Sequence, residues 1–156
     1  MKNTKSKYSF ICLALAASLL GCSGGGDSNN IVLSDTCSLD SIVGATGVVP
    51  VFTTTADSTV EFQGWLADAM NSKTPKEIKI ELINSNNQVQ LSETGSVGIR
   101  RDDVAAALKS PDVQNAGFSV KTKLTGMPVG EYGILLVGVY EKQVAACNTS
   151  RKLIIK

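Results

Sequence analysis

The sequence predicts an all-β domain, a sandwich of antiparallel strands interrupted by one short helical crossover. Apolar residues recur with a period of two along several segments, and turn-forming residues separate these segments from one another. A single stretch, starting at residue 102, has the spacing of a helix instead. Together these observations favour antiparallel strands that bury one face and expose the other.

The clearest strand is predicted at Lys76–Asn84, where Ile78, Ile80 and Leu82 alternate with polar side chains. Glu131–Tyr140 is almost continuously apolar, which predicts a central strand that is covered on both faces or crowded by its neighbours. Further strands are expected at Phe118–Leu124, Val48–Thr54, Ser58–Leu66, Gln88–Ser92 and Lys152–Ile155.

Turns and the helix follow from local chemistry. Asn84–Asn87 is expected to close a hairpin, since asparagine tolerates the left-handed backbone that such turns require. Gly126–Gly130 predicts a second tight connection, and Gly95–Gly98 a flexible link. A helix is expected to start at Asp102 or Asp103 and to stop before Pro111, which can begin a second short turn.

The first residues carry a targeting pattern. Three lysines, at positions 2, 5 and 7, precede the apolar run Phe10–Leu20, and the run closes in Leu19-Leu20-Gly21-Cys22. This pattern resembles the type II signal peptide of a bacterial lipoprotein. The resemblance implies that residues 1–21 are removed and that Cys22 becomes the mature N-terminus, carrying a diacylglyceryl group with fatty acyl chains such as palmitate.

This segment has two other interpretations. A membrane-spanning anchor is disfavoured, because the apolar run has 11 residues and crossing the hydrocarbon core takes about 20. Cleavage as an ordinary secretory signal near Ala16–Ser18 stays open. Ser23 resembles the residue that directs a lipoprotein to the outer membrane, so we expect a lipid-anchored protein of the bacterial envelope located there.

Residues 22–35 predict a flexible tether, since they are rich in glycine, serine, asparagine and aspartate. The remaining residues, 36–156, suffice for one domain with one core. Without the three lysines of the signal, 12 basic residues face 14 acidic ones, a net charge of −2. No basic stripe or basic helix is apparent, so we expect no nucleic-acid partner and membrane attachment through the lipid alone.

The four cysteines separate into two groups. Cys12 lies in the removed segment and Cys22 carries the lipid, which leaves Cys37 and Cys147. Outside the cytoplasmic membrane these two are expected to form one disulfide. A loop of 110 residues corresponds to at most about 4 to 5 kcal/mol in the chain-entropy model. A metal site is the alternative, but two cysteines without histidine make a poor ligand set.

A second resemblance concerns the domain. Four short motifs resemble landmarks of an immunoglobulin-like module found in bacterial envelope proteins: Gly64-Trp65-Leu66-Ala67-Asp68, Arg101-Asp102-Asp103-Val104-Ala105, Ala116-Gly117-Phe118 and Pro128-Val129-Gly130-Glu131-Tyr132. The match covers roughly Val60–Ile155 and implies an immunoglobulin-like antiparallel β-sandwich. The chain departs from antibody-type domains, in which the cysteines link the two central strands beside a buried tryptophan.

Catalytic and metal-binding groups are few. The absence of histidine excludes Ser-His-Asp and Cys-His arrangements and the commonest zinc sites. Asp102 and Asp103 are interpreted as helix-capping residues rather than as the paired carboxylates of a glycosidase. Calcium bound by Asp102, Asp103 and Asp112 is the alternative, although two neighbouring arginines would balance these carboxylates without a metal. We expect no enzymatic activity, no cofactor and no metal.

Aromatic residues supply the remaining hypothesis. Trp65, Tyr132 and Tyr140 could stack on sugars if they stood on an exposed sheet face, whereas core packing is the simpler role for the single tryptophan. Tyr132, at a strand entry, could instead anchor a turn through its hydroxyl, and Tyr140 is expected to be half-exposed. The sequence therefore predicts a lipid-anchored binding or scaffolding module for a protein partner or envelope polymer, with carbohydrate binding as the alternative.

Overall fold

The computed structural model describes residues 30–34, 36–68 and 70–156, and most of them lie in strands. The strands are β1 (Asn30–Leu33), β2 (Cys37–Val43), β3 (Thr46–Val48), β4 (Val51–Thr54), β5 (Thr59–Leu66), β6 (Glu77–Ile83), β7 (Val89–Ile99), β8 (Gly117–Lys123), β9 (Gly130–Val139) and β10 (Gln143–Ile155). Two short helices, α1 (Asp102–Ala107) and the 3-10 turn η1 (Pro111–Val113), connect β7 to β8. The all-β prediction with one helical crossover is confirmed.

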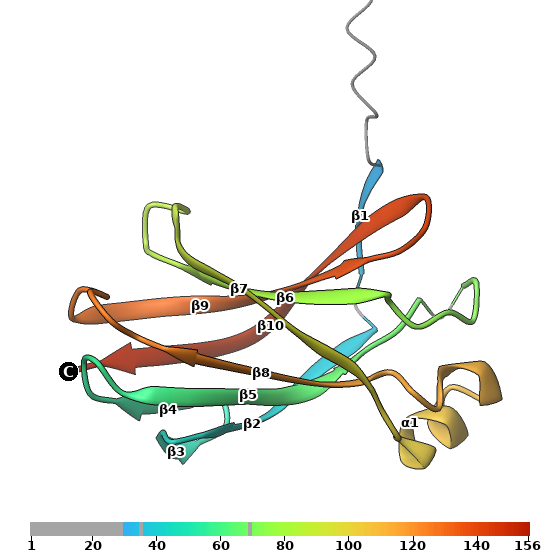
Figure 1. The fold of residues 1–156 in the computed structure, drawn as a ribbon, viewed down its shortest axis with the longest axis horizontal. Helices are drawn as coiled ribbons and strands as arrows, with labels where there is room; N and C mark the ends of the chain where they lie inside the picture. Colours follow the sequence, from blue (N-terminus) through green and yellow to red (C-terminus); the bar gives the residue numbers. More distant parts are fainter. Residues whose placement is uncertain (1–29, 35, 69) are drawn as a thin grey trace, which may run out of the picture.

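All ten strands belong to one sheet that curls into a nearly closed barrel (Figure 1). Its order is β2-β5-β8-β7-β6-β9-β10-β4-β3, and β1 pairs with β10 outside this path. The strand β7 pairs with two different strands along its length. Its residues up to Gly95 pair with β6, and its residues from Ser96 onwards pair with β8. The sheet therefore folds over at β7 and encloses a core between its two halves.

Alternation along the strands explains which side chains fill this core. Ile78, Ile80 and Leu82 of β6 are fully buried, while the residues between them are partly exposed. Phe62 of β5 and Phe118 of β8 meet them from the opposite half of the sheet as members of one hydrophobic cluster. Each buried side chain of this size contributes about 1.5–3 kcal/mol. On β9 only one face is fully covered, because the outward-facing Leu135, Val137 and Val139 are partly exposed.

The predicted disulfide is confirmed and joins the two ends of the curled sheet. Cys37 begins β2, which is an edge strand, and Cys147 lies in β10. Their Cα atoms are 6.5 Å apart, a distance suited to a disulfide. The bond therefore fastens the free edge of the first half of the sheet to the second half, on the side opposite the turn at β7.

The helical crossover packs on a small satellite core. Val104 of α1 and Val113 of η1 are buried with Ala67 and Ala116, and Trp65 packs against this group. The expected cap at Asp102 or Asp103 is wrong. Arg101 precedes the helix without a side-chain capping bond, and both aspartates lie in the first turn. Negative charge there is favourable because the helix dipole is positive at that end.

Several strands differ from the sequence-based predictions. The expected strand Val48–Thr54 is divided into β3 and β4 at Val49 and Pro50, and β2 was not predicted. The strand β7 runs through Gly95–Gly98, which was expected to be a flexible link. The last strand begins at Gln143 rather than at Lys152. Residues 30–33, assigned to the tether, form β1 and pair in parallel with residues 143–146 of β10. The predicted signal peptide, Cys22 and the tether up to residue 29 lie outside the described residues.

Candidate functional site

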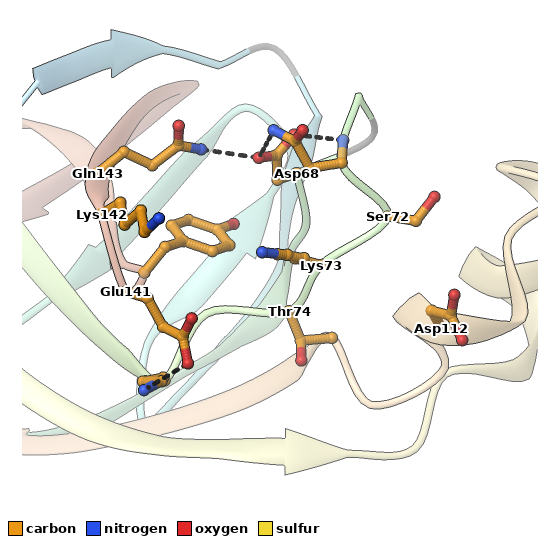
Figure 2. Close-up of a pocket in the computed structure, with 11 residues that line it drawn as sticks. Asp68, Ser72, Lys73, Thr74, Asp112, Glu141, Lys142 and Gln143 are labelled. Carbon is orange, nitrogen blue, oxygen red and sulfur yellow. Dashed lines mark hydrogen bonds and ion pairs between the residues drawn. The ribbon is translucent and has the colours of Figure 1, made fainter.

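A polar groove of about 640 Å³ lies at one end of the sheet. Its walls come from the β5–β6 connection, from the β9–β10 turn and from Asp112 of η1 (Figure 2). The lining residues are Asp68, Asn71, Ser72, Lys73, Thr74, Lys76, Asp112, Tyr140, Glu141, Lys142 and Gln143. Ligand sites for drug-like molecules are mostly apolar, so this composition indicates a polar, charged ligand instead.

Asp68 organises the groove. Its Oδ1 accepts the backbone N–H groups of Met70 (3.1 Å) and Asn71 (3.0 Å), which shapes the β5–β6 connection. Its Oδ2 accepts the side-chain amides of Asn71 and Gln143, each at 2.7 Å. The bond from Gln143 joins the β5–β6 connection to the β9–β10 turn (Figure 2). Partial burial raises the pKa of Asp68, but these hydrogen bonds outweigh it, so the pKa is lowered and the carboxylate stays ionised.

Positive charge gathers around Glu141. Lys76 forms an ion pair with Glu141 across 3.0 Å, and its hydrogen bond is the main reason that the pKa of Glu141 is lowered, with Lys73 and Lys142 adding to the effect. Within the described residues, Lys73 and Lys142 form no ion pair of their own. The groove lining therefore carries three lysines and three carboxylates, those of Asp68, Asp112 and Glu141. Asp112 lies on the far wall (Figure 2).

Tyr140 is the most unusual group in the groove lining. Its side chain is only 7% exposed, more buried than the half-exposed position expected from the sequence. Its buried hydroxyl has no hydrogen-bond partner within the part of the chain that the structure describes. Burial raises the pKa of this hydroxyl, and the negative charge of Asp68 raises it further. An unmade buried hydrogen bond costs about 1–3 kcal/mol, so Tyr140 places an unsatisfied polar group beside the groove.

The aromatic residues predicted for sugar stacking do not form an exposed platform. Tyr132 is 4% exposed, and its hydroxyl donates to the Pro128 carbonyl oxygen at 2.7 Å, as the turn-anchoring alternative expected. Trp65 is half-buried against the satellite core beside α1. Only Tyr140 reaches the groove.

The predicted calcium ligands are engaged elsewhere. Arg100 binds Asp102 at 2.9 Å, and Arg101 binds both Asp103 (2.8 Å) and Asp40 of β2 (2.7 Å). Asp112 lies in the groove lining, so the structure does not bring the three carboxylates together. Among residues 30–34, 36–68 and 70–156, no three acidic or cysteine side chains are grouped to hold a metal ion.

A second surface feature lies on the outside of β1, β10 and β9. Ile31 is paired with Val144, and Leu33 with Ala146, so these side chains point to the same face of the sheet. Val144 is in turn opposite Val139. Ile31 and Leu33 are 71% and 85% exposed. These residues, with Leu135 and Val137, form an outward-facing aliphatic surface, here called the aliphatic face.

The groove is not recognisable from the sequence, because its polar residues resemble ordinary loop residues. Asp68 and Asn71, three positions apart, do form a pattern typical of an aspartate-centred turn. The short β9–β10 turn at residues 141–142 was hidden, since no strand was expected directly after it.

Within the described residues, no helix has the length and apolar character needed to cross a membrane. In sequence comparisons, no family model and no curated protein matches this chain.

Proposed function

We propose that this chain is a lipid-anchored binding module of the bacterial envelope, without catalytic activity, which docks a protein partner or an envelope component. The groove carries the proposal. Its lining combines charged and polar residues with Tyr140, whose buried hydroxyl has no partner among the described residues. The lipobox-like Leu19-Leu20-Gly21-Cys22 supports attachment through an acyl group on Cys22 at the outer membrane.

We further propose that the curled sheet is an immunoglobulin-like sandwich. One half has the order β2-β5-β8-β7, which corresponds to A-B-E-D in such domains. The other has the order β7-β6-β9-β10, which corresponds to C′-C-F-G, with β4 added beside β10. The Tyr132 hydroxyl, at the start of β9, bonds a backbone carbonyl four residues upstream, as the tyrosine of the E–F corner does in that fold. In this arrangement the groove lies between the B–C and F–G loops, the end that antibody domains use for binding.

Site-specific photo-crosslinking tests binding at the groove. A photo-reactive amino acid replaces Lys142, which is exposed in the groove lining, and a matched variant carries it at Thr125, which is exposed in the β8–β9 connection at the other end. We expect light-dependent adducts in cells from position 142 that position 125 does not give. Equal crosslinking from both positions would contradict the proposal.

The aliphatic face favours a second role, docking of a protein partner. Exposed aliphatic side chains in register on one sheet face are typical of protein contact surfaces, and Ile31 and Leu33 are among the most exposed apolar residues described. Leu33→Asp should remove a protein that co-purifies with the detergent-solubilised lipoprotein, while Val129→Asp, a similarly exposed site at the far end, should retain it. Retention by both variants would exclude this face as the contact.

A further inference from the structure

The N-terminal strand fixes which end of the domain lies nearest to the lipid anchor. Asn30 is the Cα partner of Gln143, which itself lines the groove, and neighbouring strands are about 4.8 Å apart. The chain therefore enters the fold beside the groove, at the end of the sheet where the β9–β10 turn lies (Figure 1). The β8–β9 connection and the C-terminus lie at the other end of β9 and β10.

The length of chain before β1 limits the distance to the bilayer. Seven residues lie between Cys22 and Asn30. The eight Cα–Cα steps from Cys22 to Asn30 span at most about 28 Å when fully extended and about 16 Å for a flexible chain of this length. The strand β10, with 13 residues, is roughly 40 Å long. With Cys22 at the headgroups, the groove end is within reach of the bilayer surface, and the opposite end can lie a full strand length farther away.

The chemistry of this end suits a phospholipid surface. Lys73 and Lys142, free of ion pairs among the described residues, can contact lipid phosphates, which bind ammonium groups strongly. The carboxylate of Asp112, on the opposite wall, can form an ion pair with the ammonium group of a zwitterionic headgroup. Met70, on the same β5–β6 connection, is 88% exposed. Removing an exposed apolar side chain from water is favourable, and lysines are attracted to anionic lipid surfaces, so this connection has both properties needed to contact the headgroup region.

From these observations we infer that the groove end rests on the bilayer, with Met70 in the headgroup region and Lys73 and Lys142 on lipid phosphates. This inference rests on the proposed lipid anchor. It adds a protein contact to a membrane attachment that the sequence assigned to the lipid alone. The groove of the proposed binding module then takes a phospholipid headgroup, and the aliphatic face remains open to a protein partner.

Depth measurements on the reconstituted lipoprotein test the inference. The full chain is expressed with Met70→Cys or, as the matched control, Val129→Cys, which is 71% exposed in the β8–β9 connection. Each mature protein is labelled with a polarity-sensitive fluorophore and inserted into vesicles of phosphatidylethanolamine with phosphatidylglycerol. The label at 70 should shift to the blue and be quenched by spin-labelled lipid, whereas the label at 129 should emit as it does in water.

A charge-reversal pair separates the role of the lysines from net charge. Lys73→Glu with Lys142→Glu should abolish most of the quenching at position 70. Lys123→Glu with Lys156→Glu makes the same change in net charge at exposed sites of the opposite end and should leave the quenching intact. Equal effects of the two pairs would overturn the phosphate contact.

Flotation of the vesicles distinguishes the two proposals. If the protein floats with the vesicles while both labels remain in water, the inference is overturned and the lipid anchor stands. If the protein does not float, the proposed anchor fails, and the inference fails with it. Vesicles of phosphatidylcholine alone, added as a further arm, should still float the protein and quench the label at 70, because the lysines contact the phosphate that all these lipids share.

Discussion

Two tyrosines of the same strand region differ in what their hydroxyl groups contact. The hydroxyl of Tyr132 donates to the Pro128 carbonyl at 2.7 Å, whereas that of Tyr140 is buried without a partner in the described chain. Both rings are more than nine-tenths buried. The environment of the hydroxyl, rather than burial of the ring, therefore separates a structural tyrosine from the candidate ligand contact in the groove.

Removing each hydroxyl should have opposite consequences. Tyr132→Phe is expected to lower the free energy of unfolding by about 1 kcal/mol, because it loses a made hydrogen bond. Tyr140→Phe should leave stability unchanged or raise it, since it removes an unpaired buried hydroxyl. Urea denaturation of the two variants checks this. An equal loss in both would show that the Tyr140 hydroxyl is bonded in solution.

Asp103 offers a pH-dependent test at the same scale. The hydrogen bonds from Arg101 lower the pKa of Asp103 to about 2, below the value of about 3.9 for a free aspartate. The ionised form is thus favoured by folding, and this stabilisation is present above pH about 4 and lost as the pH falls towards 2. Relative to the wild type, Asp103→Asn should be destabilised near neutral pH.

The difference in free energy of unfolding between wild type and Asp103→Asn should become smaller as the pH falls from about 4 to about 2. Urea midpoints recorded across this range give the comparison. If this difference in stability stayed constant down to pH about 2, the contact with Arg101 would not depend on the charge of Asp103. Because this carboxylate is exposed, the direction of the change is the prediction.

At the level of elements, alternation predicted most of the strands that bury one face but missed β2. Close contacts between backbones determine other features of the sheet that alternation does not reveal. The period-two pattern of Ile78–Leu82 located β6, and Asn84 and Asn87 located the hairpin after it. Only the first part of β7 was predicted, at Gln88–Ser92, because Gly95 resembles a loop residue and the strand continues through it to Ile99. In the structure the missing side chain of Gly95 lets β7 cross closely over Ser119 and Val120 of β8.

Glycine at position 95 is therefore expected to be essential for the turn of the sheet. A Cβ atom there would lie 2.6 Å from the Ser119 carbonyl oxygen and would collide with the Val120 side chain. Gly95→Ala should destabilise the protein by about 1–3 kcal/mol through overpacking. The control is Gly133→Ala, whose Cβ would come no closer than 3.8 Å to another atom and should be neutral or stabilising.

Thermal and urea unfolding of both glycine variants provide the measurement. If Gly95→Ala were as stable as Gly133→Ala, β7 would not lie on β8 in the way described.

The strand β1 was not predicted, because residues 30–33 are a short apolar run inside a polar segment. Its pairing with β10 depends on a partner more than a hundred residues away in sequence, which no local pattern reveals.

At the scale of the whole molecule, one disulfide holds the curled sheet together, and a predicted lipid on Cys22 determines where the protein is attached. The Cys37–Cys147 disulfide spans 110 residues and fastens the edge strand β2 to β10. The groove could not be predicted from the sequence, since it forms only where the β5–β6 connection, the β9–β10 turn and η1 meet. The disulfide, by contrast, followed from counting cysteines once Cys22 was assigned to the lipid.

Loss of the disulfide should weaken the whole fold. Replacing both cysteines with alanine is expected to lower the free energy of unfolding by up to about 4 to 5 kcal/mol, because the unfolded chain regains the freedom of a long loop. Denaturation of oxidised wild type, reduced wild type and the double variant checks this. Unfolding of all three at the same urea concentration would mean that the bond contributes nothing to stability.

The location of the protein, the orientation of the groove and the proposed bilayer contact all depend on the acyl group at Cys22. Mass spectrometry of the mature N-terminal peptide, from protein extracted from the producing cells with detergent, tests this most directly. The account predicts a peptide that begins at Cys22 and carries a thioether-linked diacylglyceryl group. A peptide with an unmodified thiol at Cys22, or a mature chain that begins elsewhere, would contradict it.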